Sequence, residues 1–358
     1  MNVVAPIARI CWCGASKAKL EPFAPDYLHC KACNTLVAQA GLADDATRVE
    51  DDGVDYYGRR YWLEHQSQDL GLPDIYSRAR LDLPERCADW LEALLRYRRP
   101  PARVLEVGAG SGAYAALLSW AGFDATALDL SPWVAEFARE RFGIEYLVGA
   151  VEEQALEPRS FDVVIANDVL EHLSAPAASV ATWIHVLKPN GAFVFQTPKY
   201  DPDRSYPQLV AENDPFLEHI GRARHEHLYL FSVRAVTQLL RDVGLQHVVF
   251  EEPVYPYDMF GVASGLPLSR ADEDIDTIIG TSPTAPLVIA LLDAREAWRI
   301  SERDRADRLE VIERLDEALK ESEADRAERL AVIHRLDAAL SARSGPGELS
   351  HERERTPN

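Results

Sequence analysis

Positive charge is scarce in this sequence, in which 38 Lys and Arg residues stand against 58 Asp and Glu residues and leave a net charge of −20. This balance provides no basic surface for the phosphates of nucleic acids or anionic lipids. Long apolar runs are also missing: residues 287–292 form a run of six, whereas crossing a bilayer takes about 20. The sequence therefore argues against a nucleic-acid partner and predicts no membrane span.

Cysteine is sparse as well, with five residues in all, and four of them precede residue 34. The chain has no basic start and only a short apolar stretch before Cys11, which disfavours a secretory signal and predicts a cytoplasmic protein. A reducing compartment disfavours structural disulfides, so the clustering favours a metal site.

Two closely spaced pairs make up this cysteine cluster, Cys11 with Cys13 and Cys30 with Cys33. Four thiolates suit tetrahedral Zn²⁺, and a segment this short needs such a crosslink because it cannot bury enough apolar area. We predict a structural zinc unit over residues 1–45 with all four cysteines as ligands. Free or redox-active thiols remain the alternative, because the first pair is C-x-C rather than the commoner C-x-x-C.

Residues 46–100 are rich in aromatic and charged side chains and then show helical spacing of apolar residues up to Pro100, which predicts a helical lead-in. From residue 101 to 252, apolar strand runs alternate with helical patterns, as in a doubly wound, mostly parallel α/β sheet. The expected strands are residues 103–107, 125–128, 161–166, 192–195 and 247–250, and the expected helices are residues 114–120, 133–142 and 233–243.

The C-terminal part divides into three segments. Residues 253–286 are irregular and predict a lid or substrate-side loop. Residues 287–343 are charged and helix-forming, and the apolar series 309, 312, 315 and 319 recurs 21 residues later, which is three heptads and predicts a coiled-coil extension. Residues 344–358 predict a disordered tail. Residues 300–343 could therefore join copies of the chain or bind a partner protein.

A glycine-rich loop follows the first core strand, and its glycines Gly108, Gly110 and Gly112 are spaced two residues apart. Glu106 is the next-to-last residue of the strand. Such a loop lets a ligand approach the backbone closely. A dinucleotide fingerprint places its third glycine three residues after the second, so the spacing here suits a ligand with an amine and a carboxylate better than a pyrophosphate. A nicotinamide-dependent oxidoreductase stays open as the weaker alternative.

Five motifs in order resemble those of the class I S-adenosylmethionine-dependent methyltransferases: VLEVGAGSG, ALDLS, LVGAVEE, FDVVIANDVLEHL and LKPNGAFVFQTP. The likeness covers about 150 of the 358 residues. It implies a seven-stranded, mostly parallel sheet and transfer of a methyl group from S-adenosylmethionine. The resemblance implies that Asp129 accepts hydrogen bonds from the ribose hydroxyls of the donor and that Glu106 binds its ammonium group. Further donor contacts are expected from Gly108, Ala109, Gly110, Gly112, Leu130, Ala150, Val151 and Asn167.

Candidate acid, base and metal residues follow the fourth and fifth strands. Asp168, Glu171 and His172 are spaced to share one helical face, and in the similar ubiquinone-biosynthesis O-methyltransferases the matching residues are assigned to a divalent ion, which here would be Mg²⁺ or Mn²⁺. A purely structural hydrogen-bonding role is the alternative. His227 matches a histidine that many relatives carry four residues before a Phe, so His227, His225 and His172 are the candidate bases.

These observations predict an enzyme that methylates a hydroxyl of a small or carrier-linked acceptor, such as a sugar of a surface polysaccharide or natural product, with a histidine as base. The N-terminal cysteine unit beside such a core resembles the architecture of bacterial methyltransferases that act on such sugars. The alternative of another class is an assembly protein of a glycan-synthesis complex that acts through its C-terminal heptads.

Overall fold

The computed structural model describes residues 5–6, 9–42, 48–220, 226–271 and 273–343. The chain divides into two units, Met1–Arg295 and Glu296–Asn358, and each is described by itself. His225 and the predicted tail at residues 344–358 lie outside the described residues.

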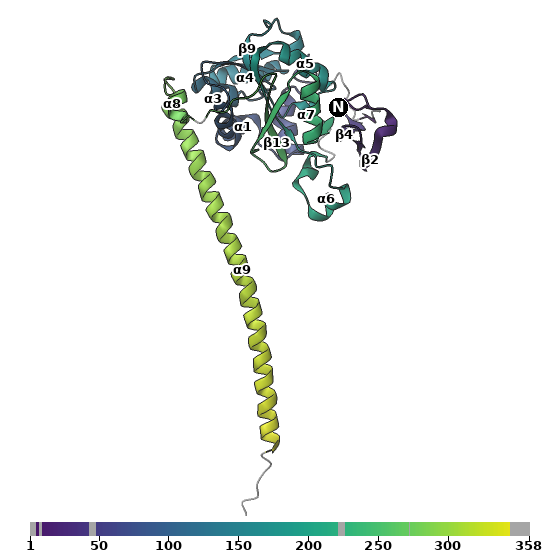
Figure 1. Ribbon diagram of the computed structural model, residues 1–358, viewed down its shortest axis with the longest axis vertical. Helices are drawn as coiled ribbons and strands as arrows, with labels where there is room; N and C mark the ends of the chain where they lie inside the picture. Colours follow the sequence, from purple (N-terminus) through teal and green to yellow (C-terminus); the bar gives the residue numbers. More distant parts are fainter. Residues whose placement is uncertain (1–4, 7–8, 43–47, 221–225, 272, 344–358) are drawn as a thin grey trace, which may run out of the picture. The chain divides into compact units, whose positions relative to one another are not determined.

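The larger unit is built on a seven-stranded sheet (Figure 1) with the strand order β12-β13-β10-β9-β6-β7-β8. Five neighbouring strands are parallel, and β13 runs antiparallel between β10 and β12. This confirms the mostly parallel α/β sheet expected from the sequence. In spatial order the strands are β12 (His247–Glu251), β13 (Asp258–Ser264), β10 (Leu187–Pro198), β9 (Phe161–Asn167), β6 (Arg103–Val107), β7 (Asp124–Asp129) and β8 (Glu145–Val148).

The segment 253–286 was expected to be an irregular lid, and for β13 this expectation is wrong. All seven residues of β13 are buried, because helices cover both faces of the sheet there and no alternation of polar residues marks the strand in the sequence. Gly261 is needed at this position, since a Cβ there would lie 2.5 Å from the ring of Phe195 on β10.

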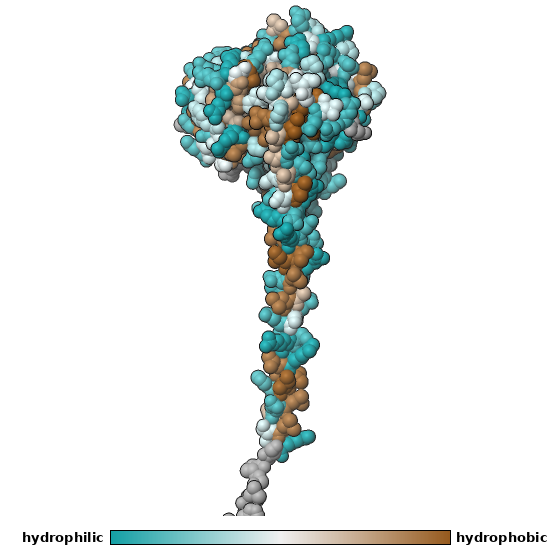
Figure 2. Space-filling view, turned by 90° about the vertical axis from the view of Figure 1, so that its left-hand side faces the viewer, coloured by the Kyte–Doolittle hydropathy of each residue, from teal (hydrophilic) through white to brown (hydrophobic). Residues whose placement is uncertain are grey.

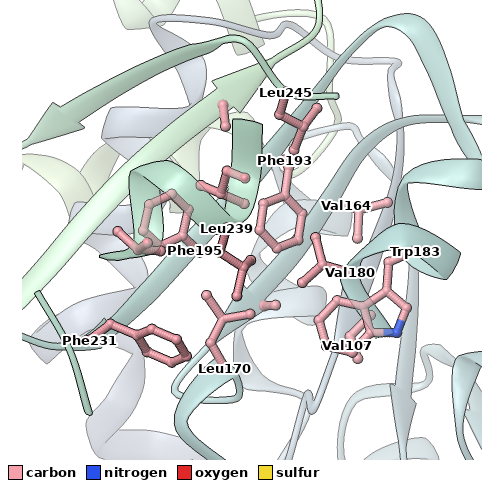
Figure 3. Close-up of a cluster of buried hydrophobic side chains, with 14 of the residues drawn as sticks. Val107, Val164, Leu170, Val180, Trp183, Phe193, Phe195, Phe231, Leu239 and Leu245 are labelled. Carbon is pink, nitrogen blue, oxygen red and sulfur yellow. The ribbon is translucent and has the colours of Figure 1, made fainter. Parts of the chain in front are cut away.

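Helices cover both faces of the sheet. On one face α5 (Pro176–His185) and α7 (Val233–Asp242) pack on Val164, Phe193 and Phe195, as Figure 3 shows. Alternate residues of the same strands, such as Val163 and Val194, point to the other face. That face is covered by helices from the lead-in and from the first two crossovers, namely α1 (Ile75–Asp82), η4 (Leu83–Cys87), α2 (Ala88–Leu95), α3 (Ala113–Trp120) and α4 (Pro132–Phe142).

A second sheet of four strands contains the cysteine segment, with the order β11-β4-β3-β2. Its first three strands are β2 (Leu20–Ala24), β3 (Tyr27–Cys30) and β4 (Thr35–Ala38), and β1 (Ala5–Pro6) pairs separately with β5 (Ala40–Gly41). The fourth strand, β11 (Tyr229–Phe231), lies about 190 residues later in the sequence, after β10, and pairs antiparallel with β4. The cysteine unit is therefore joined by backbone hydrogen bonds to the segment that follows His227.

The C-terminal segment contains α8 (Ile275–Ile279) and the long helix α9 (Ala285–Arg343), which confirms the predicted helix. Ala285, Val288 and Leu292 at the start of α9 are buried in the core of the first unit. From residue 301 to 343, all but one of the α9 residues are exposed, including its apolar ones. Within the described part of the chain, no helix is both long and apolar enough to cross a membrane.

Candidate functional site

The glycine loop after β6 is shaped by close contacts that exclude side chains. Gly108, Gly110 and Gly112 all have positive φ, at 70°, 51° and 78°. A Cβ on Gly108 would lie 2.6 Å from Val169, and one on Gly110 would lie 2.7 Å from the ring of Trp62. Gly108 and Gly110 can therefore lie this close to Val169 and Trp62 only because they carry no side chain.

Asp129 is buried where β7 ends beside this loop. Its carboxylate accepts hydrogen bonds from the backbone N–H groups of Gly110 at 3.0 Å and Leu130 at 2.7 Å. Burial raises the pKa of Asp129. The cap of α4 is Ser131, whose hydroxyl accepts from the Val134 amide at 3.2 Å, so Asp129 is not needed as a helix cap. Its remaining lone pairs are available for hydroxyl donors.

Two adjoining cavities of about 320 and 550 Å³ open at this edge of the sheet. Both are lined by Gly108, Trp62, Asp168 and His172, so they meet at the glycine loop. The first also contains Glu106, Ala109, Gly110, Asn167 and His227, and the second contains Asp129, Leu130, Ala150 and Val151.

Gly112 is the one predicted donor contact that lines neither cavity. A Cβ on it would lie within 2.9 Å of Ala138 and Ile144, so this glycine lets α3 pack closely against the α4 region.

Buried polar atoms without partners face the first cavity. Glu106 is 6% exposed, and its Oε2 atom has no hydrogen-bond partner; the side-chain oxygen and nitrogen of Asn167 have none either. Burial raises the pKa of Glu106 to about 8. Because such groups are normally satisfied inside proteins, the cavity is arranged for a ligand with a charged or hydrogen-bonding end.

Glu171, His172 and His227 come together in the same cavity from η6 (Leu170–His172) and the segment before β11. The two imidazole centroids are 5.0 Å apart, and the His172 Nε2 atom lies 3.9 Å from a Glu171 oxygen. The hydroxyl of Thr197 donates to the other Glu171 oxygen at 2.9 Å. Burial raises the pKa of Glu171 well above its usual range.

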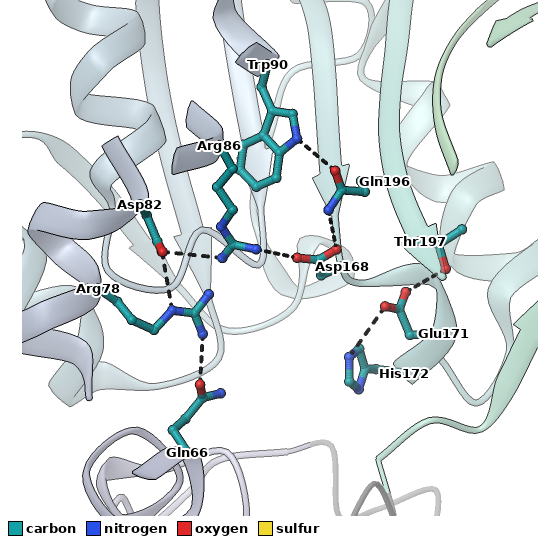
Figure 4. A network of polar contacts seen from close by, with 10 residues as sticks. All are labelled: Gln66, Arg78, Asp82, Arg86, Trp90, Asp168, Glu171, His172, Gln196 and Thr197. Carbon is teal, nitrogen blue, oxygen red and sulfur yellow. Dashed lines mark hydrogen bonds and ion pairs between the residues drawn. The ribbon is translucent and has the colours of Figure 1, made fainter. Parts of the chain in front are cut away.

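Asp168 does not join this group, although it was predicted as a metal ligand with Glu171 and His172. Figure 4 shows it turned to the lead-in, where its carboxylate pairs with the Arg86 guanidinium at 2.7 Å and accepts from Gln196 at 3.0 Å. The residues that lie close enough to share an ion are Glu171, His172 and His227. The structure thus does not support the predicted Mg²⁺ or Mn²⁺ ligand set.

The lead-in supplies site residues that the sequence analysis did not identify. Arg86 on η4 lies over the ring of Trp90, with its guanidinium carbon 5.0 Å from the ring centroid. Trp90 in turn donates to Gln196 at 2.9 Å. Arg78, Asp82 and Arg86 follow one another at spacings of four on one helical face, a pattern that the sequence does contain.

A group of tyrosines packs beside His172 and the buried Glu226. The hydroxyl of Tyr57 lies 3.2 Å from the Nδ1 atom of His172. The hydroxyl of Tyr56 donates to buried Glu226 at 3.1 Å and contacts His65. Asp52, a few residues before these tyrosines, accepts a hydrogen bond from the Trp133 amide at 2.8 Å. This bond joins the tyrosine segment to the start of α4.

The four predicted cysteine ligands form a compact group. The sulfur atoms of Cys11 and Cys33 are 3.5 Å apart, those of Cys13 and Cys30 are 3.8 Å apart, and all four lie within 4.8 Å of one another. A tetrahedron with Zn–S bonds of about 2.3 Å has edges of about 3.8 Å. The donor set therefore fits zinc. Hydrogen bonds from the other cysteines, chiefly Cys11, lower the pKa of the Cys33 thiol to about 5.

This cysteine unit reaches the histidine site directly. The phenol of Tyr27 on β3 donates to the backbone carbonyl of His227 at 2.8 Å. One residue further, the backbone N–H of Leu228 donates to the carbonyl of Glu171 at 2.7 Å. The backbone of residues 227–228 is thus held from both sides, by the cysteine unit and by η6.

Comparison with known proteins identifies the core. A family model described as a methyltransferase domain matches residues 79–249. A ubiquinone biosynthesis O-methyltransferase from Neisseria meningitidis is 30% identical over 214 residues, which cover 57% of this chain and 85% of the relative. Another protein of that description, from Thiobacillus denitrificans, is 29% identical over 150 residues, which cover 40% of this chain and 64% of the relative.

The chain therefore spans less than two thirds of the length of the Thiobacillus relative. Among solved structures, a SAM-dependent methyltransferase from Thermotoga maritima overlaps with a TM-score of 0.40 at 19% identity, covering 54% of this chain and 96% of that one. An overlap of this size says nothing about the substrate. The ordered motifs, the sheet and the Neisseria relative agree, and the chain belongs to the class I S-adenosylmethionine-dependent methyltransferases.

Proposed function

We propose that this chain methylates a hydroxyl group on a small or carrier-linked acceptor, such as a sugar of a polysaccharide or natural product, with His227 as the base. The observation that carries the proposal is the position of His227 and His172 in the cavity that also contains Glu106 and the glycine loop. The O-methyltransferase names of the Neisseria and Thiobacillus relatives support the choice of oxygen as the methylated atom.

The residues of the two cavities fit the methyl donor. Glu106 and Asn167 have unpartnered polar atoms for the amino-acid end, and Gly108 and Gly110 in the adjoining loop carry no side chain. Asp129 would accept from the ribose hydroxyls, and Leu130, Ala150 and Val151 would contact the adenine. When bound, the donor supplies an electrophilic methyl group on a sulfonium.

Proton release tests the role of Glu106. Its pKa of about 8 means that the carboxyl is mostly protonated at pH 7 in the free protein, and facing an ammonium would require it to ionise. Binding of S-adenosylhomocysteine at pH 7 is expected to release up to about one proton, and affinity should rise with pH towards 8 and then level off. Calorimetry in buffers of different ionisation enthalpy measures this release.

Glu106→Gln should abolish the release, whereas Glu145→Gln, at an exposed position on β8, should keep it. Equal proton release by wild type and Glu106→Gln would remove Glu106 from the proposed role.

The hydrogen bond at Nδ1 determines which ring nitrogen of neutral His227 carries the hydrogen. Its partner is the carbonyl oxygen of His219 at 2.9 Å, which can only accept, so Nδ1 carries the hydrogen. In the neutral ring Nε2 is then the basic atom, and it can take a proton from an acceptor hydroxyl. For His172, the Tyr57 hydroxyl beside Nδ1 can donate or accept, so no tautomer is fixed.

Replacement of His227 tests the base. His227→Gln is expected to lower kcat by about 10²- to 10⁴-fold while leaving the affinity for S-adenosylhomocysteine unchanged, because general base catalysis acts on the acceptor. A donor-dependent mass-spectrometric screen of sugars, sugar nucleotides and phenols, scored by gain of one methylene, identifies the acceptor for this assay. His185→Gln, at the exposed end of α5, is the control. A full-rate His227→Gln enzyme would contradict the assignment.

The cysteine group is proposed to hold a structural zinc ion through Cys11, Cys13, Cys30 and Cys33. The purified protein should contain about one zinc per chain. Cys33→Ser should lose zinc and lower both the unfolding temperature and kcat, because β4 and Tyr27 hold the backbone at His227. Cys87→Ser, which alters the buried fifth cysteine outside the group, should keep its zinc. Zinc content equal in both variants would exclude this site.

A second proposal concerns self-association through α9. Figure 2 shows two brown patches along the helix, and they correspond to two sets of exposed residues 21 positions apart: Leu309, Ile312, Leu315 and Leu319, and Leu330, Ile333, Leu336 and Leu340. Isolated exposed leucines are common, but two repeated stripes at heptad spacing favour pairing between helices. The alternative of a scaffold that binds another protein would use the same stripes.

Combined replacement of Leu315 and Leu336 by Gln tests this pairing. We expect the full-length variant to have the mass of one chain, whereas wild type and a control with Glu317→Gln and Ala338→Gln on the opposite face have a multiple of it. Light scattering measures the mass. A monomeric wild type would end the proposal of self-association.

A further inference from the structure

A buried carboxyl group that the methyl-transfer chemistry does not use lies in the same cavity as His227. Asp258 is the first residue of β13, and it stands opposite Pro198 at the end of β10. The residue is 4% exposed. Among the described residues, the Asp258 carboxyl group has no hydrogen bond and no ion pair; the charge of Arg86 acts on it, but Arg86 is bonded to Asp168 instead.

Arg86, the cation whose charge acts on Asp258, already has carboxylate partners. Arg86 pairs with Asp168 at 2.7 Å and with Asp82 at 3.3 Å. Arg78 pairs with Asp82 at 3.3 Å and donates to Gln66. Figure 4 shows these two arginines paired with two aspartates. Neither arginine forms an ion pair with Asp258.

An unpaired buried carboxyl group is costly for the protein. Burial, with Asp168 as the next cause, raises the pKa of Asp258 to about 8. Aspartate is rarely buried unless it is paired, and a buried group that faces a cavity can be paired by what the cavity binds. A ligand that brings a positive charge would remove this cost.

Aromatic side chains line the same cavity as this carboxyl group. Tyr255 and Tyr257, just before β13, have stacked rings with centroids 5.3 Å apart and an angle of 3° between their planes. The ring of His219 lies 5.1 Å from that of Tyr257, and all three residues line the cavity. Aromatic faces beside a carboxylate are a combination that attracts an ammonium group.

We propose that Asp258, with Tyr255 and Tyr257, binds a protonated amine of the acceptor and thereby directs a neighbouring hydroxyl to His227. The acceptor class is then an amino alcohol, such as an amino sugar, rather than a neutral sugar. This inference rests on the proposed function, since it concerns the acceptor side of the same site. The amine is a recognition group, and no bond to it changes.

Matched pairs of compounds test the acceptor class. The probes are the methyl glycosides of glucosamine and galactosamine against those of glucose and galactose, and tyramine against tyrosol. Binding to the full-length protein saturated with S-adenosylhomocysteine is measured by calorimetry. At least one amine is expected to bind about ten- to a hundredfold more tightly than its hydroxyl counterpart, as for a hydrogen bond between charged groups.

Variants show whether Asp258 is the cause. Asp258→Asn and Asp258→Ser should bring amine and hydroxyl probes within about twofold of each other, whereas Glu85→Gln, which alters an exposed carboxylate at the mouth of the cavity, should keep the preference. The proposal is wrong if no amine is preferred by the wild type, or if Asp258→Asn keeps the preference. Failure to bind S-adenosylhomocysteine would instead contradict the proposed function.

Discussion

The absence of three side chains after β6 is the constraint on which the rest of the site depends. Val169 and Trp62 approach the backbone of Gly108 and Gly110 so closely that a methyl group would not fit. Val169 belongs to the turn after β9, and Trp62 belongs to the lead-in, so the loop brings together parts of the chain that are far apart in sequence. Asp129 stabilises the loop by accepting a hydrogen bond from the backbone amide of Gly110. Both cavities meet at this point.

The histidine end of the site depends on a second sheet rather than on the large one. His227 is followed at once by β11, which pairs with β4 of the cysteine unit. The Tyr27 phenol fixes the carbonyl of His227, and the carbonyl of His219 fixes its ring. The cysteine unit, which in the sequence stands apart from the core, thus supports the backbone of a candidate catalytic residue.

Local signals in the sequence predicted the features that depend on local chemistry. The close contacts at the glycines, the hydrogen bonds of Asp129 and the clustering of the four cysteines follow from particular residue types at short spacings, which a sequence displays directly. Arg86 and Tyr57 could not be identified in this way, because their partners Asp168 and His172 lie 82 and 115 residues away in the sequence. Asp258 lies in the segment expected to be irregular, and no local pattern marks it. The strand β13 was missed because a fully buried antiparallel strand has no polar alternation. Asp168 was assigned to the wrong group because helical spacing alone says nothing about Arg86.

The position of β11 in the sequence affects synthesis of the chain. The ribosome completes β4 about 190 residues before β11 emerges, which at 5–20 residues per second is roughly 10–40 s. During that interval one edge of β4 has no neighbouring strand, and the segment that contains the four cysteines lacks the support of β11. An open strand edge invites pairing with other nascent chains. Early capture of a metal ion would shorten the period in which the newborn N-terminus is vulnerable to misassembly and oxidation.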